Sequence, residues 1–137
     1  MAKDVIHTPV RNALENDGWT ITDDQYTVVY AEFTMYPDLA AERTLAAQRG
    51  TEKIAVEIKS FIGPSAVQDV KEALGPYVMY RTYLTRLEPE RKLYLAISTR
   101  AYHDIFQLKA VQLLVNEFKI ALIVVNIEQE EIAIWID

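Results

Sequence analysis

The chain has 137 residues and half of them are hydrophobic, which is enough for one domain with a core of its own. It contains no cysteine and two histidines, which excludes disulfides, thiolate metal sites and cysteine nucleophiles and disfavours a zinc site built from histidine. The formal net charge of -6 disfavours a simple electrostatic DNA binder, while leaving room for a local basic groove or a metal-bridged phosphate site.

The amino terminus has no apolar run typical of a secretion signal, and no apolar stretch approaches membrane-spanning length. We therefore expect a soluble, cytoplasmic protein that makes no membrane contact. No repeat, low-complexity tract or linker interrupts the sequence, so residues 1–137 are expected to form a single domain.

The first half of the chain begins with a predicted helix that ends at Gly18. Residues 19–24 indicate a short strand or turn, and residues 26–36 are rich in β-branched and aromatic residues, as in a strand. Residues 38–48 have a helical composition but precede a turn at Arg49-Gly50, and we predict a strand there. The apolar residues at helical spacing in the first helix are Val5, Ile6, Val10, Ala13 and Leu14.

Residues 53–61 form the most clearly predicted strand, because apolar and charged residues alternate along it. Gly63-Pro64 ends this strand, and Ser65 then begins a long helix, with Gln68 at the capping-box spacing. One strand face carries Ile54, Val56 and Ile58, and the other carries Lys53, Ala55, Glu57 and Lys59. The predicted inward stripe of the helix is Val67, Val70, Leu74, Tyr77, Val78, Arg81 and Leu84.

The second half alternates strands and helices. Residues 92–98 predict a buried strand, residues 101–118 a second long helix, and residues 120–137 two strands joined by a turn at 126–130. This order of elements indicates a mixed sheet with helices on its faces, an α/β (α+β) fold.

Glu57 and Lys59 are two residues apart on the strand, so both side chains leave the same face. A carboxylate and an ammonium held together in this way suit the binding of a divalent cation and the stabilisation of charge on a phosphate. A hard cation prefers a second carboxylate, for which Asp38 is the candidate, with Glu42 on the same strand face as a further one. The alternative is a solvated strand face with a Glu57–Lys59 ion pair of little energetic value.

The acidic-x-Lys pattern alone has little specificity, because it also occurs on the two predicted helices. Other polar residues have a structural interpretation beside a functional one. His7 suits packing or capping better than a site, and Gln68 suits the capping box as well as a phosphate contact. Three tyrosines suggest base stacking, but their helical spacing favours core packing. These tyrosines are Tyr77, Tyr80 and Tyr83, and the basic cluster worth naming is Arg81, Arg86, Arg91 and Lys92.

Several stretches make the chain closely similar to the XisH family, the fdxN element excision controlling factors of filamentous cyanobacteria. They are "AKDVIHTPVRNALENDGWTITDD" near the start, "DLAAER" at 38–43, "KIAVEIKSFIGPS" at 53–65, "ALGPYVMYR" at 73–81 and the final "IWI". The likeness covers essentially the whole chain, and its central motif is specific.

This resemblance implies a restriction-endonuclease-like PD-(D/E)xK fold with the core order αβββαβ. It also implies a role in the programmed excision of a DNA element during heterocyst differentiation, with DNA, a site-specific recombinase (XisF) and a small companion (XisI) as partners. In that superfamily the corresponding residues hold Mg²⁺ (or Mn²⁺) and activate water. The resemblance gives those roles to Asp38 and Glu57 as metal ligands and to Lys59 beside them as a catalytic residue.

Two positions depart from the pattern that the resemblance implies. The relatives are expected to have glutamine where this chain has Pro76, which puts substrate contact at that position in doubt. Many members of the superfamily also use a glutamate on the first helix, for which Glu15 is the candidate, although an exposed structural residue is the better interpretation of Glu15.

Two functions compete at this stage. The first is a metal-dependent endonuclease or nuclease-like factor acting at an excision site, a function that the retained Asp38, Glu57 and Lys59 favour. The second is a non-catalytic module of the same fold that regulates a recombinase through protein contacts, which the net charge favours. The habit of the superfamily suggests a homodimer in either case.

Overall fold

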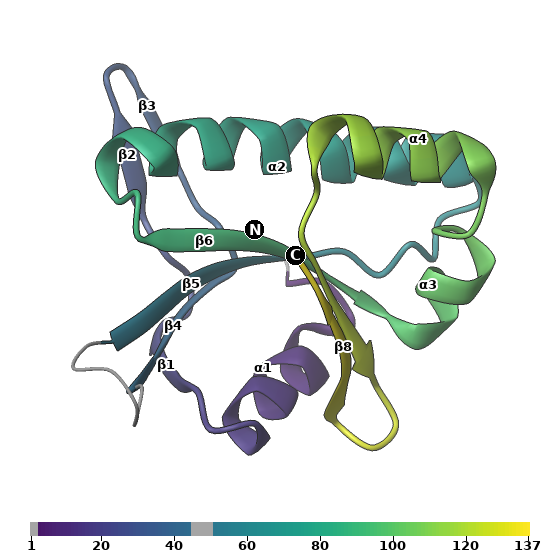
Figure 1. Ribbon diagram of the computed structural model, residues 1–137, viewed down its shortest axis with the longest axis horizontal. Helices are drawn as coiled ribbons and strands as arrows, with labels where there is room; N and C mark the ends of the chain where they lie inside the picture. The colour runs from purple at the N-terminus through teal and green to yellow at the C-terminus, as the bar shows by residue number, and fades with distance from the viewer. Residues whose placement is uncertain (1–2, 45–50) are drawn as a thin grey trace.

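The computed structural model describes residues 3–44 and 51–137, and it shows a six-stranded mixed sheet with helices on both faces (Figure 1). The strand order is β1-β4-β5-β6-β7-β8, in which β5, β6 and β7 are parallel to one another and the other neighbours are antiparallel. The strands are β1 (Thr20–Asp23), β4 (Leu39–Thr44), β5 (Thr51–Ile58), β6 (Arg91–Ser98), β7 (Leu122–Asn126) and β8 (Glu131–Ile136). The predicted mixed sheet flanked by helices is therefore confirmed.

The helices divide between the two faces of the sheet, and Figure 1 shows α1 on one side with α2 and α4 on the other. They are α1 (His7–Asn16), α2 (Ala66–Leu87), α3 (Thr99–Asp104) and α4 (Lys109–Phe118). Within the described ranges, no helix is both long and apolar enough to cross a membrane. The alternation along β5 explains the two layers, because Ile54, Val56 and Ile58 pack in the core under α1, whereas Ala55 packs in the core under α2.

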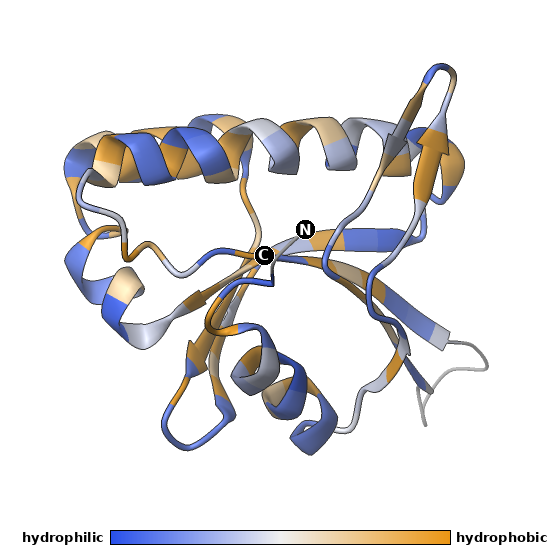
Figure 2. Ribbon diagram, turned by 180° about the vertical axis from the view of Figure 1, so that it is seen from behind, coloured by the Kyte–Doolittle hydropathy of each residue, from blue (hydrophilic) through white to orange (hydrophobic). Residues whose placement is uncertain are grey.

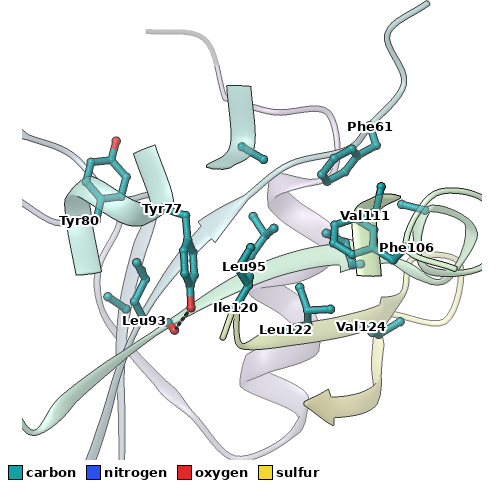
Figure 3. Packing of buried hydrophobic residues seen from close by; sticks show 14 of the residues in the cluster. Phe61, Tyr77, Tyr80, Leu93, Leu95, Phe106, Val111, Ile120, Leu122 and Val124 are labelled. Carbon is teal, nitrogen blue, oxygen red and sulfur yellow. Dashed lines mark hydrogen bonds between the residues drawn. The ribbon is translucent and has the colours of Figure 1, made fainter. Parts of the chain in front are cut away.

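The core under α2 is built from aromatic and aliphatic side chains (Figure 3). Phe61 and Phe106 meet edge to face with ring centroids 5.1 Å apart, a favourable aromatic geometry. The Tyr77 hydroxyl donates to the carbonyl oxygen of Leu93 at 3.2 Å and accepts from the backbone N–H of Ala121 at 2.9 Å. This tyrosine therefore joins α2 to the sheet while its polar atom is satisfied in the core.

Several predicted elements are confirmed. Helix α1 ends where Gly18 adopts a positive φ of 93°, a conformation that glycine adopts without steric cost. The ambiguous segment is a strand over Leu39–Thr44, and the predicted turn at Arg49-Gly50 lies outside the described residues. Ser65 caps α2 by accepting the backbone N–H of Gln68 at 3.2 Å.

Two predicted elements are wrong in the same way, because each is two elements. Residues 26–36 form a hairpin of β2 (Val28–Tyr30) and β3 (Phe33–Met35) instead of one strand. Residues 101–118 form α3 and α4 instead of one helix, because Ile105 and Phe106 leave the helical path to enter the core and Leu108 is extended. In both cases β-branched or helical composition continues through the break, so composition alone does not reveal it.

The predicted inward stripe of α2 is also partly wrong. Val67 is 67% exposed, whereas Ala73, Tyr80 and the predicted Tyr77 and Leu84 are buried. Val67 faces outward while its neighbours Ala66 and Val70 pack against the core, so an apolar side chain is left at the surface.

Candidate functional site

Asp38 and Glu57 come together at the end of two antiparallel strands. Leu39 pairs with Val56 in the register of β4 and β5, so Asp38, one residue before β4, falls beside Glu57. The backbone N–H of Ile58 donates to Oδ2 of Asp38 at 2.7 Å and holds this carboxylate in place. The predicted carboxylate pair is thus present in the structure.

The two carboxyl groups are half-buried, and each affects the ionisation of the other. Burial, followed by the charge of Asp38 and a hydrogen bond to it, raises the pKa of Glu57 to about 9. Burial also raises the pKa of Asp38, opposed by the hydrogen bonds from Ile58 N–H and from Glu57. At neutral pH Glu57 therefore keeps its proton beside the carboxyl group of Asp38.

Lys59 lies just beyond β5, and its ammonium points to helix α2. Nζ is 2.9 Å from Oε2 of Glu72 and 3.8 Å from Oδ1 of Asp69. The ion pair with Glu57 that the sequence offered as an alternative is absent from the described residues. Lys59 is thus next to the carboxylate pair along the chain, but two carboxylates of α2 hold its charge.

Asp4 is a third carboxylate near the pair, and sequence reasoning missed it. Its Oδ2 accepts the backbone N–H of Ser60 at 3.0 Å and its Oδ1 accepts that of Ile6 at 3.1 Å. Its charge contributes to the raised pKa values of Asp38 and Glu57. The available signal was an aspartate just before a predicted helix, which indicates a cap and not a site.

Tyr80 is a second missed neighbour of the pair. Burial comes first, followed by the charges of Glu57 and Asp38, in raising the pKa of its hydroxyl to about 12. The sequence placed Tyr80 in a row of helical tyrosines and predicted core packing, which its burial confirms. It packs in the core and also lies near enough to the carboxylates to feel their charge.

His7 is buried against a carboxylate from the segment after β1. Its Nε2 lies 3.0 and 3.1 Å from the two carboxylate oxygens of Asp24, which also accepts from Arg11 at 2.7 Å. These contacts lower the pKa of Asp24 against the opposing effect of its burial. Packing and the contacts with Asp24 therefore account for this histidine.

The accessory candidates lie apart from the pair. Glu42 is 3.6 Å from Arg91, and Glu15 pairs with Arg11 at 3.4 Å on α1. The amide of Gln68 donates to Oε1 of Glu72 at 3.1 Å, so Gln68 reaches Lys59 only through Glu72.

The two carboxylates of the pair suit a magnesium ion that keeps most of its water ligands. They do not suit a metal ion bound entirely by protein side chains. Among residues 3–44 and 51–137, no group of three or more Asp, Glu, His or Cys side chains is arranged to hold a metal. Mg²⁺, however, is commonly bound through one or two carboxylates with water in the other positions. Asp38 and Glu57 provide two such carboxylates on adjacent strands.

Comparison with known proteins gives one consistent result. The model of the family described as XisH protein matches residues 1–133. A crystal structure of an XisH family protein from Nostoc punctiforme PCC 73102 is 39% identical, covers 98% of this chain and 100% of its own, and superposes with a TM-score of 0.88. That of an fdxN element excision controlling factor protein from Anabaena variabilis is 38% identical, with the same coverages and TM-score. No curated protein matches the chain. The chain belongs to the XisH family.

Proposed function

We propose that this chain controls excision of a DNA element of the fdxN type and acts on DNA through a metal-dependent, endonuclease-like centre. The observation that carries the proposal is the half-buried pair of Asp38 and Glu57 on adjacent strands, where burial and the charge of Asp38 raise the pKa of Glu57. Burying two carboxyl groups side by side costs stability, and such strongly perturbed pairs cluster at functional sites.

The strand order supports the comparison with restriction-endonuclease-like proteins. Apart from the β2–β3 hairpin, the chain runs α1, β1, β4, β5, α2, β6, which matches the αβββαβ core that the resemblance implies. In this arrangement Asp38 and Glu57 would hold Mg²⁺ or Mn²⁺, which would supply Lewis acidity at a phosphate. The residues of the chain would bind the ion and orient water, with Lys59 released from Glu72 to face the phosphate.

A second function has its own observation. Lys59 is engaged by Glu72 and Asp69 of α2 and not by Glu57, which is an arrangement without an exposed catalytic ammonium. This favours a nuclease-shaped module that regulates a site-specific recombinase through contacts with a companion protein. DNA, an XisI-like companion and an XisF-like recombinase are the partners that the two proposals invoke.

Cleavage of labelled DNA tests the first function. Purified protein is incubated with duplex, nicked and branched DNA in Mg²⁺ or Mn²⁺, beside Glu57→Gln, Lys59→Ala and the matched surface control Glu15→Gln. We expect metal-dependent products from the wild type and from Glu15→Gln, and none from the two site variants. If folded protein, with the companion protein added, leaves every DNA substrate intact, the first function is wrong and the regulatory module is the remaining function.

A further inference from the structure

An apolar groove runs between α2 and α4, on the side of the sheet opposite α1. Its volume is about 290 Å³, and it is lined by the first turns of α2 and by the start of α4, including Val67, Leu74, Leu108 and Leu114. Figures 1 and 2 show α4 alongside the amino-terminal half of α2 from opposite sides. Beneath the groove, a smaller cavity reaches the core at Phe61 and shares part of its lining.

Large apolar side chains along this groove are exposed to solvent. Val67 is 67% exposed and Leu108 is 49% exposed. Helix α4 is mostly apolar, yet Val111 is its one buried residue, although all of α4 is described. Leu114 and Val115 are half-buried, and Val115 packs against the core. Only part of the apolar surface of α4 is therefore covered, and Leu108 and Ala110 remain exposed at the groove.

The charges beside the groove have a definite sign. Lys71 lines the groove and Lys109 begins α4 between two lining residues, and neither has a carboxylate within ion-pair distance in the described part of the chain. The two carboxylates on the same turns of α2 are already engaged, since Asp69 accepts the N–H of Gly63 and Glu72 binds Lys59. The free charge at this groove is therefore positive, although the whole chain carries -6.

We propose that the α2–α4 groove binds an amphipathic helix of a partner protein, with an apolar stripe flanked by Asp or Glu. A groove between two helices accepts a third helix through apolar side chains at i, i+3, i+4 and i+7. Carboxylates along the edge of that helix complement Lys71 and Lys109. A second copy of this chain fits less well, because two chains of -6 repel each other. The proposal does not depend on the metal chemistry of Asp38 and Glu57.

The test uses the full chain and two synthetic helical peptides of about 18 residues, long enough for the required anchor positions. Both carry leucine at i, i+3, i+4 and i+7, and they differ only in having glutamate or lysine at the flanking positions. Fluorescence anisotropy measures binding. We expect the glutamate peptide to bind at least about tenfold more tightly than the lysine peptide, and Lys71→Glu to reverse this order.

Variants at exposed positions locate the site without threatening the fold. Val67→Asp and Leu108→Asp should each weaken the glutamate peptide by about tenfold or more, as expected for anchors in an apolar groove. The matched control is Val29→Asp, which is 55% exposed on the β2–β3 hairpin and should bind the peptide like the wild type.

Three results would overturn the proposal. The first is equal binding of both peptides, or binding insensitive to Val67→Asp and Leu108→Asp. The second is a dimer in analytical ultracentrifugation that dissociates in Leu108→Asp, which would make a second copy the occupant. The third is binding to vesicles of phosphatidylglycerol that Lys71→Glu abolishes, with no peptide bound, which would make a lipid surface the partner.

Discussion

At the scale of the residue, Asp38 and Glu57 lie side by side and half-buried, and Glu57 keeps its proton at neutral pH. This arrangement disfavours ionisation of Glu57, because its charged form loses water and meets the charge of Asp38. The electrostatic cost of keeping this pair in the folded state therefore rises with pH.

The pH dependence of stability follows from the pKa of Glu57, which rises from 4.5 to about 9 on folding. The stabilising effect of this raised pKa is complete below pH 4.5 and is lost as the pH rises through about 9. In that window the Glu57 contribution to the free energy of unfolding falls by roughly 1.4 kcal/mol per pH unit. Urea denaturation at pH 6 and pH 8 should show a loss of about 3 kcal/mol in the wild type that Glu57→Gln avoids. Glu15→Gln is the control for removal of a negative charge. Equal losses of unfolding free energy in all three proteins would contradict the raised pKa of Glu57.

Binding of a divalent cation at the pair must displace the proton of Glu57. At pH 7.5 Glu57 is almost fully protonated, because its pKa is about 9. Titration calorimetry with Mn²⁺ in buffers of different ionisation enthalpy should therefore report release of about one proton per ion. Asp38→Asn should bind Mn²⁺ at least about tenfold more weakly and release less than one proton. Binding without proton release would place the ion elsewhere on the molecule.

The carboxylate pair was predictable from the sequence, but its surroundings were not. Strand alternation and register bring Asp38 to Glu57 once both segments are strands. The partners of Lys59 come from α2, whose rotation relative to the sheet is set by packing and not by local spacing. Asp4 and Tyr80 reach the pair from elements far away in sequence, and no periodicity records such contacts.

At the scale of the element, the connection from β5 to α2 is where the candidate site meets the helix. Gly63 donates its backbone N–H to Oδ2 of Asp69 at 2.9 Å, and a Cβ atom at Gly63 would lie 2.7 Å from Oδ1 of the same residue. The buried Asp69 also lies 3.8 Å from Lys59. The tight approach at Gly63 thus fixes a carboxylate that holds the lysine.

Replacement of this glycine should therefore destabilise the protein and disturb Lys59. We expect Gly63→Ala to lower the free energy of unfolding by about 1–3 kcal/mol, since the buried Asp69 side chain must move and lose its hydrogen bond from the Gly63 N–H. Gly75→Ala in α2 is the control, because no atom lies within 4 Å of the added methyl group, and its change should stay below about 1 kcal/mol. Urea denaturation measures both changes. Equal effects would show that Asp69 moves away from the added methyl group at little cost.

Boundaries of elements were harder to predict than their types. Residues 53–61 alternate between apolar and charged side chains, and residues 92–98 are mostly apolar. Both segments contribute strands to the sheet. The breaks at Ala31 and at residues 105–108 follow from tertiary contacts, since the β2–β3 hairpin packs Tyr30 on Tyr83 and the second break buries Phe106. Such contacts override local propensity, and the single sequence contains no signal for them.

At the scale of the whole molecule, the net negative charge opposes DNA binding, whereas a divalent cation at the candidate site would favour it. The net charge of -6 repels a polyphosphate, and the carboxylate pair adds to this repulsion. The basic cluster offers little relief, because Arg91 is buried and bound to Glu88, and Arg81 donates to backbone carbonyls at 2.6 and 3.0 Å. A divalent cation at Asp38 and Glu57 would change the local sign and join protein to phosphate.

DNA binding should therefore depend on a divalent cation if the first proposed function holds. Ca²⁺ takes oxygen ligands like Mg²⁺ and is a suitable probe for binding apart from cleavage. In fluorescence anisotropy with a labelled duplex, we expect affinity in Ca²⁺ to exceed that in EDTA by at least about tenfold at low salt. Glu57→Gln should lose this difference, whereas Glu42→Gln, which leaves the pair intact, should keep it. Equal binding in Ca²⁺ and EDTA would mean that DNA, if bound, is recognised away from the carboxylate pair, and would favour the regulatory function.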